Sequence, residues 1–206
     1  MNKIAHIFSW ILSPVLIPTY AVFVALWVTL LSFLPVDARW GVVAMTWVIT
    51  CAIPVVAILL LYKFKVISAP GLNQQRERYI PYVVTALCYL GCGLYMYRAH
   101  APMWLVMFMV GGAAAAFVSC FINIWWKISA HGAAMGGLLA LMFRILVDGL
   151  NVIDIWPLIS ITILLTGILG SARIVLNCHT FWQVIAGVAN GFFWVFLLSL
   201  IHISEP

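Results

Sequence analysis

Apolar runs about as long as a membrane is thick dominate this chain. The stretch "MWLVMFMVGGAAAAFVSCFI", Met103 to Ile122, holds no charged residue, and a helix needs about 20 mostly apolar residues to cross a bilayer. Over all 206 residues, 66% of the side chains are hydrophobic and 7% are charged. Soluble domains have about 45–50% apolar and about 25% charged residues. The sequence therefore predicts an all-α, polytopic membrane helix bundle.

Proline, glycine and charged residues divide the apolar part into seven predicted helices, which form a single domain over residues 1–206. The ranges are 9–34, 40–62, 81–98, 103–124, 131–148, 156–171 and 180–200. We expect about six or seven transmembrane helices. Pro14, Pro18 and Pro54 lie inside these runs, and we expect each to kink its helix rather than end it, because neighbouring groups can take up the freed carbonyls.

The charged residues are few, and most of them are basic. Ten Lys and Arg against five Asp and Glu give a net charge of +5. Several convergent carboxylates are needed for a magnesium site, a calcium site or paired-carboxylate hydrolysis. The five Asp and Glu of this chain therefore argue against all three. The positive charge fits an anionic substrate or lipid headgroups, although cytoplasmic loops produce the same excess. We expect the bilayer as a partner and no nucleic acid, and the oligomeric state stays open.

Three polar segments, 62–81, 126–132 and 170–183, interrupt the apolar runs. Two predicted helices separate the first segment from the second, and two more separate the second from the third. An even number of crossings returns a chain to the same side, so all three segments should meet at one membrane surface. Together they hold cations, a hydroxyl and two imidazoles: Arg76, Arg78, Lys127, Ser129, His131, Arg173 and His179.

This set of side chains predicts a phosphate site. Arginine binds phosphate oxygens through two N–H groups, lysine adds a point charge and serine donates a hydrogen bond. His131 lies where a helix is expected to begin, and helix N-termini favour anions. One neutral imidazole can attack phosphorus while the other, protonated, supplies a proton to the departing oxygen. We expect no metal and no other cofactor, because the cations can spread the transition-state charge.

The order and spacing of these residues resemble the type 2 phosphatidic acid phosphatases (PAP2), which are related to vanadium haloperoxidases. The family pattern runs KxxxxxxRP, then PSGH, then SRxxxxxHxxxD. Here "KISAH" is similar to the second motif and "ARIVLNCHTFWQ" to the third, and the resemblance spans about residues 73–187. It implies a PAP2-like helical fold, with His179 as the nucleophile that forms a phosphohistidine and His131 as the acid on the leaving group. Phosphate would be held by Arg173, Ser129 and the backbone at Ala130 and His131.

The first motif departs from the family pattern. It has no Lys six residues before an Arg-Pro pair, so either Arg76 or Arg78 fills the arginine place, and Lys127 is our candidate for the missing ammonium. Two smaller changes are Ala130 for glycine and Ala172 for serine.

The third motif departs at Gln183, where the family usually has Asp. An Asp one helical turn from His179 would stabilise the imidazolium, whereas Gln carries no charge. This predicts either a weaker nucleophile or compensation by Glu77. "HTFWQVIAG" is nevertheless similar to the dolichyl-diphosphate phosphatase branch.

The resemblance implies a lipid phosphatase that acts on a polyprenyl diphosphate or a substrate of the phosphatidic acid type. Two alternatives stay open, a lipid phosphotransferase and a catalytically weak phospholipid-binding protein. The positive-inside rule, applied to Lys3, Lys63 and Lys65, would place the active face in the cytoplasm. The resemblance implies an extracytoplasmic face instead. We expect the second orientation, with the site on the periplasmic face of a bacterial inner membrane.

Two further features lie outside the motifs. Arg144 is expected to pair with Asp148, four residues later. The ending "LSLIHISEP", Leu198 to Pro206, resembles a translated sequencing-library adapter, so we expect the chain to be a fragment cut within its last helix, and we give that ending no functional role.

Overall fold

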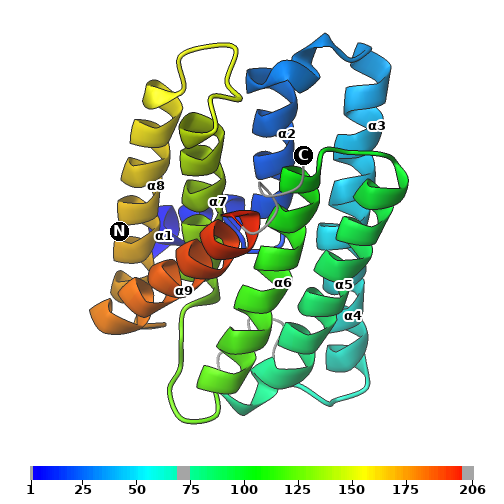
Figure 1. Cartoon of the computed structure of the whole chain (residues 1–206). Coiled ribbons are helices and arrows are strands. Elements are labelled where there is room, and N and C mark those ends of the chain that lie inside the picture. The colour runs from blue at the N-terminus through cyan, green and yellow to red at the C-terminus, as the bar shows by residue number, and fades with distance from the viewer. Residues whose placement is uncertain (1, 69–74, 201–206) are drawn as a thin grey trace.

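The computed structural model describes residues 2–68 and 75–200, and of Asn2 only the backbone. Within these residues the chain is a bundle of helices (Figure 1). The α-helices are α1 (Asn2–Ile11), α2 (Ile17–Val28), α3 (Val36–Trp47), α4 (Ile53–Lys63), α5 (Tyr79–Arg98), α6 (Met103–Ile122), α7 (Ala130–Val147), α8 (Trp156–Val175) and α9 (Phe181–Leu200). Shorter turns are the 3₁₀ helices η1 (Leu30–Phe33) and η3 (Arg76–Arg78) and the π-helical turn η2 (Val48–Ala52).

Six helical segments of the described chain are long and apolar enough to cross a membrane. They are Val36–Lys63, Arg76–Arg98, Met103–Ile122, Ala130–Val147, Trp156–Val175 and Phe181–Leu200, and a shorter apolar helix covers Ile17–Val28. The predicted polytopic all-α bundle is therefore confirmed, and the protein is an integral, multi-pass membrane protein. Residues 201–206, most of the adapter-like ending, lie outside the described residues.

The first predicted helix, 9–34, is wrong. The chain leaves the helix after Ile11 and enters a new one at Ile17. Pro14 lies in the break, where a proline ring would clash with the carbonyl four residues earlier in a continuous helix. Pro18 is in the first turn of α2, where the missing N–H removes no intrahelical hydrogen bond. As a result α1 is a separate helix, which passes behind α8 and α7 in Figure 1 and packs against α8.

The helix that contains Pro54 continues, as predicted. The π turn η2 joins α3 to α4, and within it the N–H of Ile53 bonds to the carbonyl of Val48, five residues earlier. A π turn widens the helix locally. It directly precedes Pro54, whose ring would crowd a regular α-helical carbonyl.

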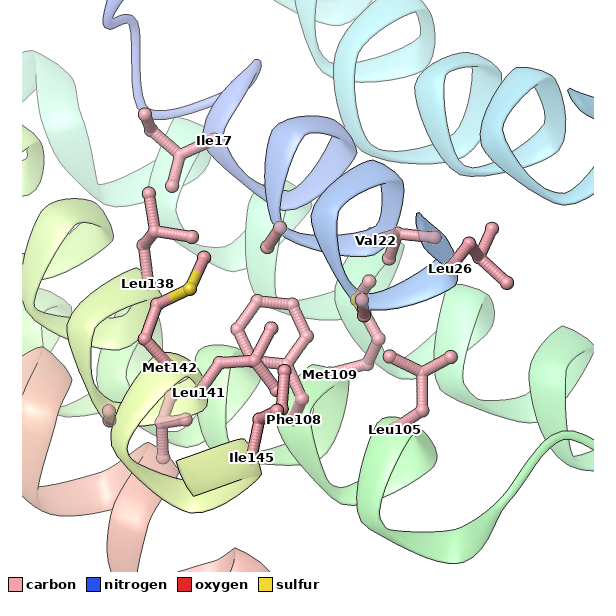
Figure 2. Close-up of a cluster of buried hydrophobic side chains, with 14 of the residues drawn as sticks. Ile17, Val22, Leu26, Leu105, Phe108, Met109, Leu138, Leu141, Met142 and Ile145 are labelled. Carbon is pink, nitrogen blue, oxygen red and sulfur yellow. The ribbon is translucent and has the colours of Figure 1, made fainter. Parts of the chain in front are cut away.

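The apolar core lies where α2, α6 and α7 meet (Figure 2). The side chains that Figure 2 labels are Ile17, Val22, Leu26, Leu105, Phe108, Met109, Leu138, Leu141, Met142 and Ile145. Among the six spanning segments α7 is the most buried. It also carries Arg144, whose guanidinium is buried and pairs with Asp148, as predicted.

Glycines allow α7 and α9 to cross with their backbones in contact. A Cβ atom on Gly132 would lie 2.7 Å from the carbonyl oxygen of Val184, and three other glycines of α7 and α9 have still less room. Those three and the carbonyls that they face are Gly136 with Val188, Gly187 with Ser129, and Gly191 with Ala133. Small residues four apart on both helices favour a steep crossing in membranes, and Figure 1 shows α9 inclined across α7.

Candidate active site

Hydrogen bonds join the three polar segments. Arg78 donates to the carbonyl of Ile128 at 3.5 Å. Just before the second segment, Gln75 and Asn123 exchange two side-chain to backbone bonds, of 2.5 Å from Gln75 Nε2 and 2.8 Å from Asn123 Nδ2. The backbone N–H of Ser129 donates to the carbonyl of Gln183 at 3.2 Å. The structure thus brings together the segments that the even-crossing argument places on one side.

The connection between α6 and α7 runs back into the bundle before α7 begins (Figure 1). Its last residues, Ile128 and Ser129, have 0% of their surface exposed. Ser129 is the N-cap of α7, and its Oγ accepts from the N–H of Gly132 at 3.2 Å. This bond leaves the hydroxyl proton able to donate to an anion beside the helix N-terminus.

His179 is oriented by a capping box at the start of α9. Thr180 Oγ accepts from the N–H of Gln183 at 3.4 Å, and Gln183 Oε1 accepts from the N–H of Thr180 at 3.1 Å. Gln183 Oε1 also lies 3.2 Å from Nδ1 of His179. Because an amide oxygen only accepts, Nδ1 carries the proton, and the lone pair of the neutral imidazole is on Nε2. Gln183 therefore caps the helix and sets the tautomer of His179.

Positive charge and burial keep His179 neutral. Only 6% of its surface is exposed. Burial, together with the charges of Arg78, Arg173 and Lys127, lowers the pKa of the imidazole to about 4, and the hydrogen bond that Nδ1 donates to Gln183 opposes the shift. At neutral pH this side chain is an uncharged base with cations around it.

Arg173 and His131 meet at a residue of the N-terminal helix. Arg173 lies in the last turn of α8, because that helix runs four residues past the predicted end at 171. Its Nη1 donates to Ser9 Oγ at 2.7 Å. His131, in the first turn of α7, has its Nε2 at 3.1 Å from the carbonyl oxygen of Ser9 and 3.3 Å from its Oγ. Sequence reasoning missed Ser9, and no motif or spacing points to it.

A narrow crevice between α7, α8 and α9 connects these groups. Ser129, His131 and Arg173 line it, together with apolar side chains such as Met135 and Leu169. We call the cluster of Arg78, Lys127, Ser129, His131, Arg173 and His179 the recessed site.

The structure separates the two arginines of the first segment. Arg78 is buried, donates to the carbonyl of Ile128 at 3.5 Å, and its charge acts on His179. Arg76 is exposed and lines a different, polar groove with Tyr79. Of the two candidates for the arginine place, Arg78 is therefore the one beside the other site residues.

Lys127 lies at the edge of the recessed site. Burial and the charge of Arg78, with a smaller contribution from Arg173, lower the pKa of its ammonium group. Glu77, one of the two alternatives offered for the missing Asp, accepts from the N–H of Ser68 at 2.7 Å. Within 2–68 and 75–200, no group of three or more His, Cys, Asp or Glu could hold a metal ion.

No family model matches the chain, and neither a curated protein nor a solved structure matches it. Its fold is that of a multi-pass helical membrane protein. Its recessed site combines five basic or imidazole side chains, from separate helices and connections, with the N-cap of α7.

Proposed function

We propose that this chain is a membrane-embedded lipid phosphatase that works through a phosphohistidine on His179. One observation carries the proposal: the imidazole is buried among cations and its Nδ1–H donates to Gln183 Oε1, so the lone pair is on Nε2. A neutral imidazole held within fixed positive charge is suited to attack the phosphorus of an anionic ester.

The reaction has two steps. First, Nε2 of His179 bonds to phosphorus as the bond from phosphorus to the leaving oxygen breaks, and His131 gives a proton to that oxygen. The leaving oxygen is the ester oxygen of a phosphomonoester or the bridging oxygen of a diphosphate. Arg173 and Ser129 hold the phosphate oxygens. Then water attacks phosphorus, the electron pair of the N–P bond returns to Nε2, and His131 takes the proton of the water. The products are inorganic phosphate and the lipid with one phosphate fewer.

The substrate class follows from the resemblance and from the surface around the site. The similarity of "HTFWQVIAG" to the dolichyl-diphosphate phosphatase branch favours a polyprenyl diphosphate, with a substrate of the phosphatidic acid type as the other choice. Large exposed aromatic side chains stand close to site residues in the sequence: Trp125 and Trp126 precede Lys127, and Trp182 follows His179. Such residues are typical of the headgroup level of a membrane, where a lipid phosphate lies. We propose the periplasmic face of a bacterial inner membrane as the location.

Phosphate release from purified protein tests this function. The substrates are a polyprenyl diphosphate, phosphatidic acid and phosphatidylglycerol phosphate, each with wild type, His179→Ala and His131→Ala. His6→Ala is the matched control, because His6 is an exposed histidine. We expect release by the wild type and the control, and an acid-labile phosphoprotein that His179→Ala does not form. Release by His179→Ala at the wild-type rate would contradict the proposal.

The same assay separates the alternatives. A phosphorylated lipid acceptor in place of free phosphate would identify a phosphotransferase. Gln183, which carries no charge to stabilise an imidazolium, motivates the second alternative, a phospholipid-binding protein with weak activity. That alternative predicts no release from any substrate while His179→Ala leaves lipid binding intact.

A further inference from the structure

Helix α1 brings one polar side chain to the recessed site. Its inner face packs on the bundle through Ala5, Phe8 and Leu12, while Ile7 and Trp10 are exposed on the outside. Ser9 lies on the inner face between Phe8 and the break that follows Ile11. Apolar packing of α1 against α8 therefore holds the Ser9 backbone and hydroxyl at a fixed place beside two site residues.

Ser9 uses two different groups for two different partners. Its hydroxyl oxygen accepts from the guanidinium of Arg173, and its carbonyl oxygen accepts from Nε2 of His131. Since a carbonyl cannot donate, the proton of the neutral His131 ring is on Nε2. A second proton binds at Nδ1. His131 can donate that proton while its Nε2–H stays hydrogen-bonded to the carbonyl of Ser9.

We propose that Ser9 is a positioning residue of the recessed site and that α1 is its fourth segment. Ser9 fixes the guanidinium of Arg173 and the imidazole of His131 relative to each other, in the way that Gln183 fixes His179. The need for such a residue follows from burial, because Arg173 also has a buried Nε with no hydrogen-bond partner in the described chain. A guanidinium with few partners adopts one orientation only if those partners are fixed.

The inference rests on the proposed function for its turnover measurement, but its binding measurement does not. Purified full-length protein is titrated with inorganic phosphate by calorimetry, and Arg173→Ala identifies binding at this site by abolishing it. We expect Ser9→Ala to weaken phosphate binding about tenfold, the lower end of the contribution of a hydrogen bond to a charged group. Ser9→Thr keeps the hydroxyl and should restore binding. Ser13→Ala, a serine with no side-chain hydrogen bond in the described chain, should bind as the wild type does.

The turnover measurement uses the lipid phosphates named above. Ser9→Ala should lower kcat/KM by at least the factor lost in phosphate binding, and Ser9→Thr should recover it. Wild-type or tighter phosphate binding by Ser9→Ala would overturn the inference, and tighter binding would mean that Ser9 blocks the site. Absence of phosphate binding by the wild type would overturn it as well. If the wild type binds phosphate but hydrolyses no lipid, the proposed function fails, and binding by the Ser9 variants alone decides the inference.

Discussion

Replacing Gln183 with Glu should strengthen the nucleophile without disturbing its surroundings. A glutamate oxygen can accept from Thr180 and from Nδ1 of His179, as the amide oxygen does, so the capping box and the tautomer are kept. The added negative charge lies one hydrogen bond from the imidazole, where it favours the protonated ring. Gln183→Glu therefore raises the pKa of His179 from its value of about 4.

The size of the effect follows from the contact distance. The ring and the new carboxylate would be about as close as the 3.2 Å that separates Nδ1 from Gln183 Oε1. A charge at such a distance shifts a pKa by about 2 units, or about 2.7 kcal/mol. If the transition state for N–P bond formation carries about half of the imidazolium charge, the barrier falls by about 1.4 kcal/mol, which is about a tenfold gain in rate.

The pH profile of kcat/KM measures both parts of this prediction. The wild-type profile should rise with pH through the pKa of about 4, because His179 must be neutral to attack. In Gln183→Glu the rise should move about 2 units higher and the plateau should increase. Thr180→Ala is the control: it removes the acceptor for the N–H of Gln183, which costs about 1 kcal/mol of helix stability, but it should leave the pH profile unchanged. A profile that does not move in Gln183→Glu would refute the assignment of Gln183 to His179.

Three further predictions concern other parts of the site and the bundle. Arg78→Gln should lower kcat/KM by about 10- to 100-fold through the loss of charged hydrogen bonds. It should also move the rise of the pH profile to higher pH, since the charge of Arg78 helps to lower the pKa of His179. Arg76→Gln should do neither, and equal effects of the two substitutions would contradict the separation of the two arginines. Lys127→Ala should weaken the binding of inorganic phosphate about tenfold if this lysine replaces the one missing from the first motif, and unchanged binding in calorimetry would remove it from the site. Gly191→Ala should lower the thermal stability in detergent by more than about 1 kcal/mol, because the new methyl group meets the backbone of Ala133, while Gly167→Ala, with open space around it, should unfold at the wild-type temperature.

The spanning helices could be predicted because a lipid environment leaves the chain few options. A long apolar run has to be helical, since only a helix satisfies its own backbone in lipid. Whether a proline ends such a helix depends on the residues that pack around the proline in the folded chain, and these cannot be read from the sequence. The same residue type therefore had opposite outcomes: the chain breaks at Pro14 and continues past Pro54.

The parts of the site set by local spacing could also be predicted, and the long-range ones could not. His179 and Gln183 are four residues apart, and the capping box at the start of α9 turns the Gln183 side chain back toward His179. Ser9 contacts His131 and Arg173, which are 122 and 164 residues away in sequence. Such contacts depend on the break before α2 and on how α1 packs, and no pattern along the chain encodes either.

Around the start of α9, two residues at the recessed site and two glycines of the helix crossing recur at the same spacing of four residues. His179, Gln183, Gly187 and Gly191 follow one another at this spacing, the first two at the recessed site and the last two against the backbone of α7. Inserting or deleting one residue between 179 and 191 would rotate one part against the other by about 100°, which would put side chains into the crossing or turn the imidazole away. We therefore expect related sequences to tolerate changes of loop length elsewhere but none within these thirteen positions, and S-x-H-G-x₃-G followed by H-x₃-Q-x₃-G-x₃-G to be a geometric fingerprint for finding them.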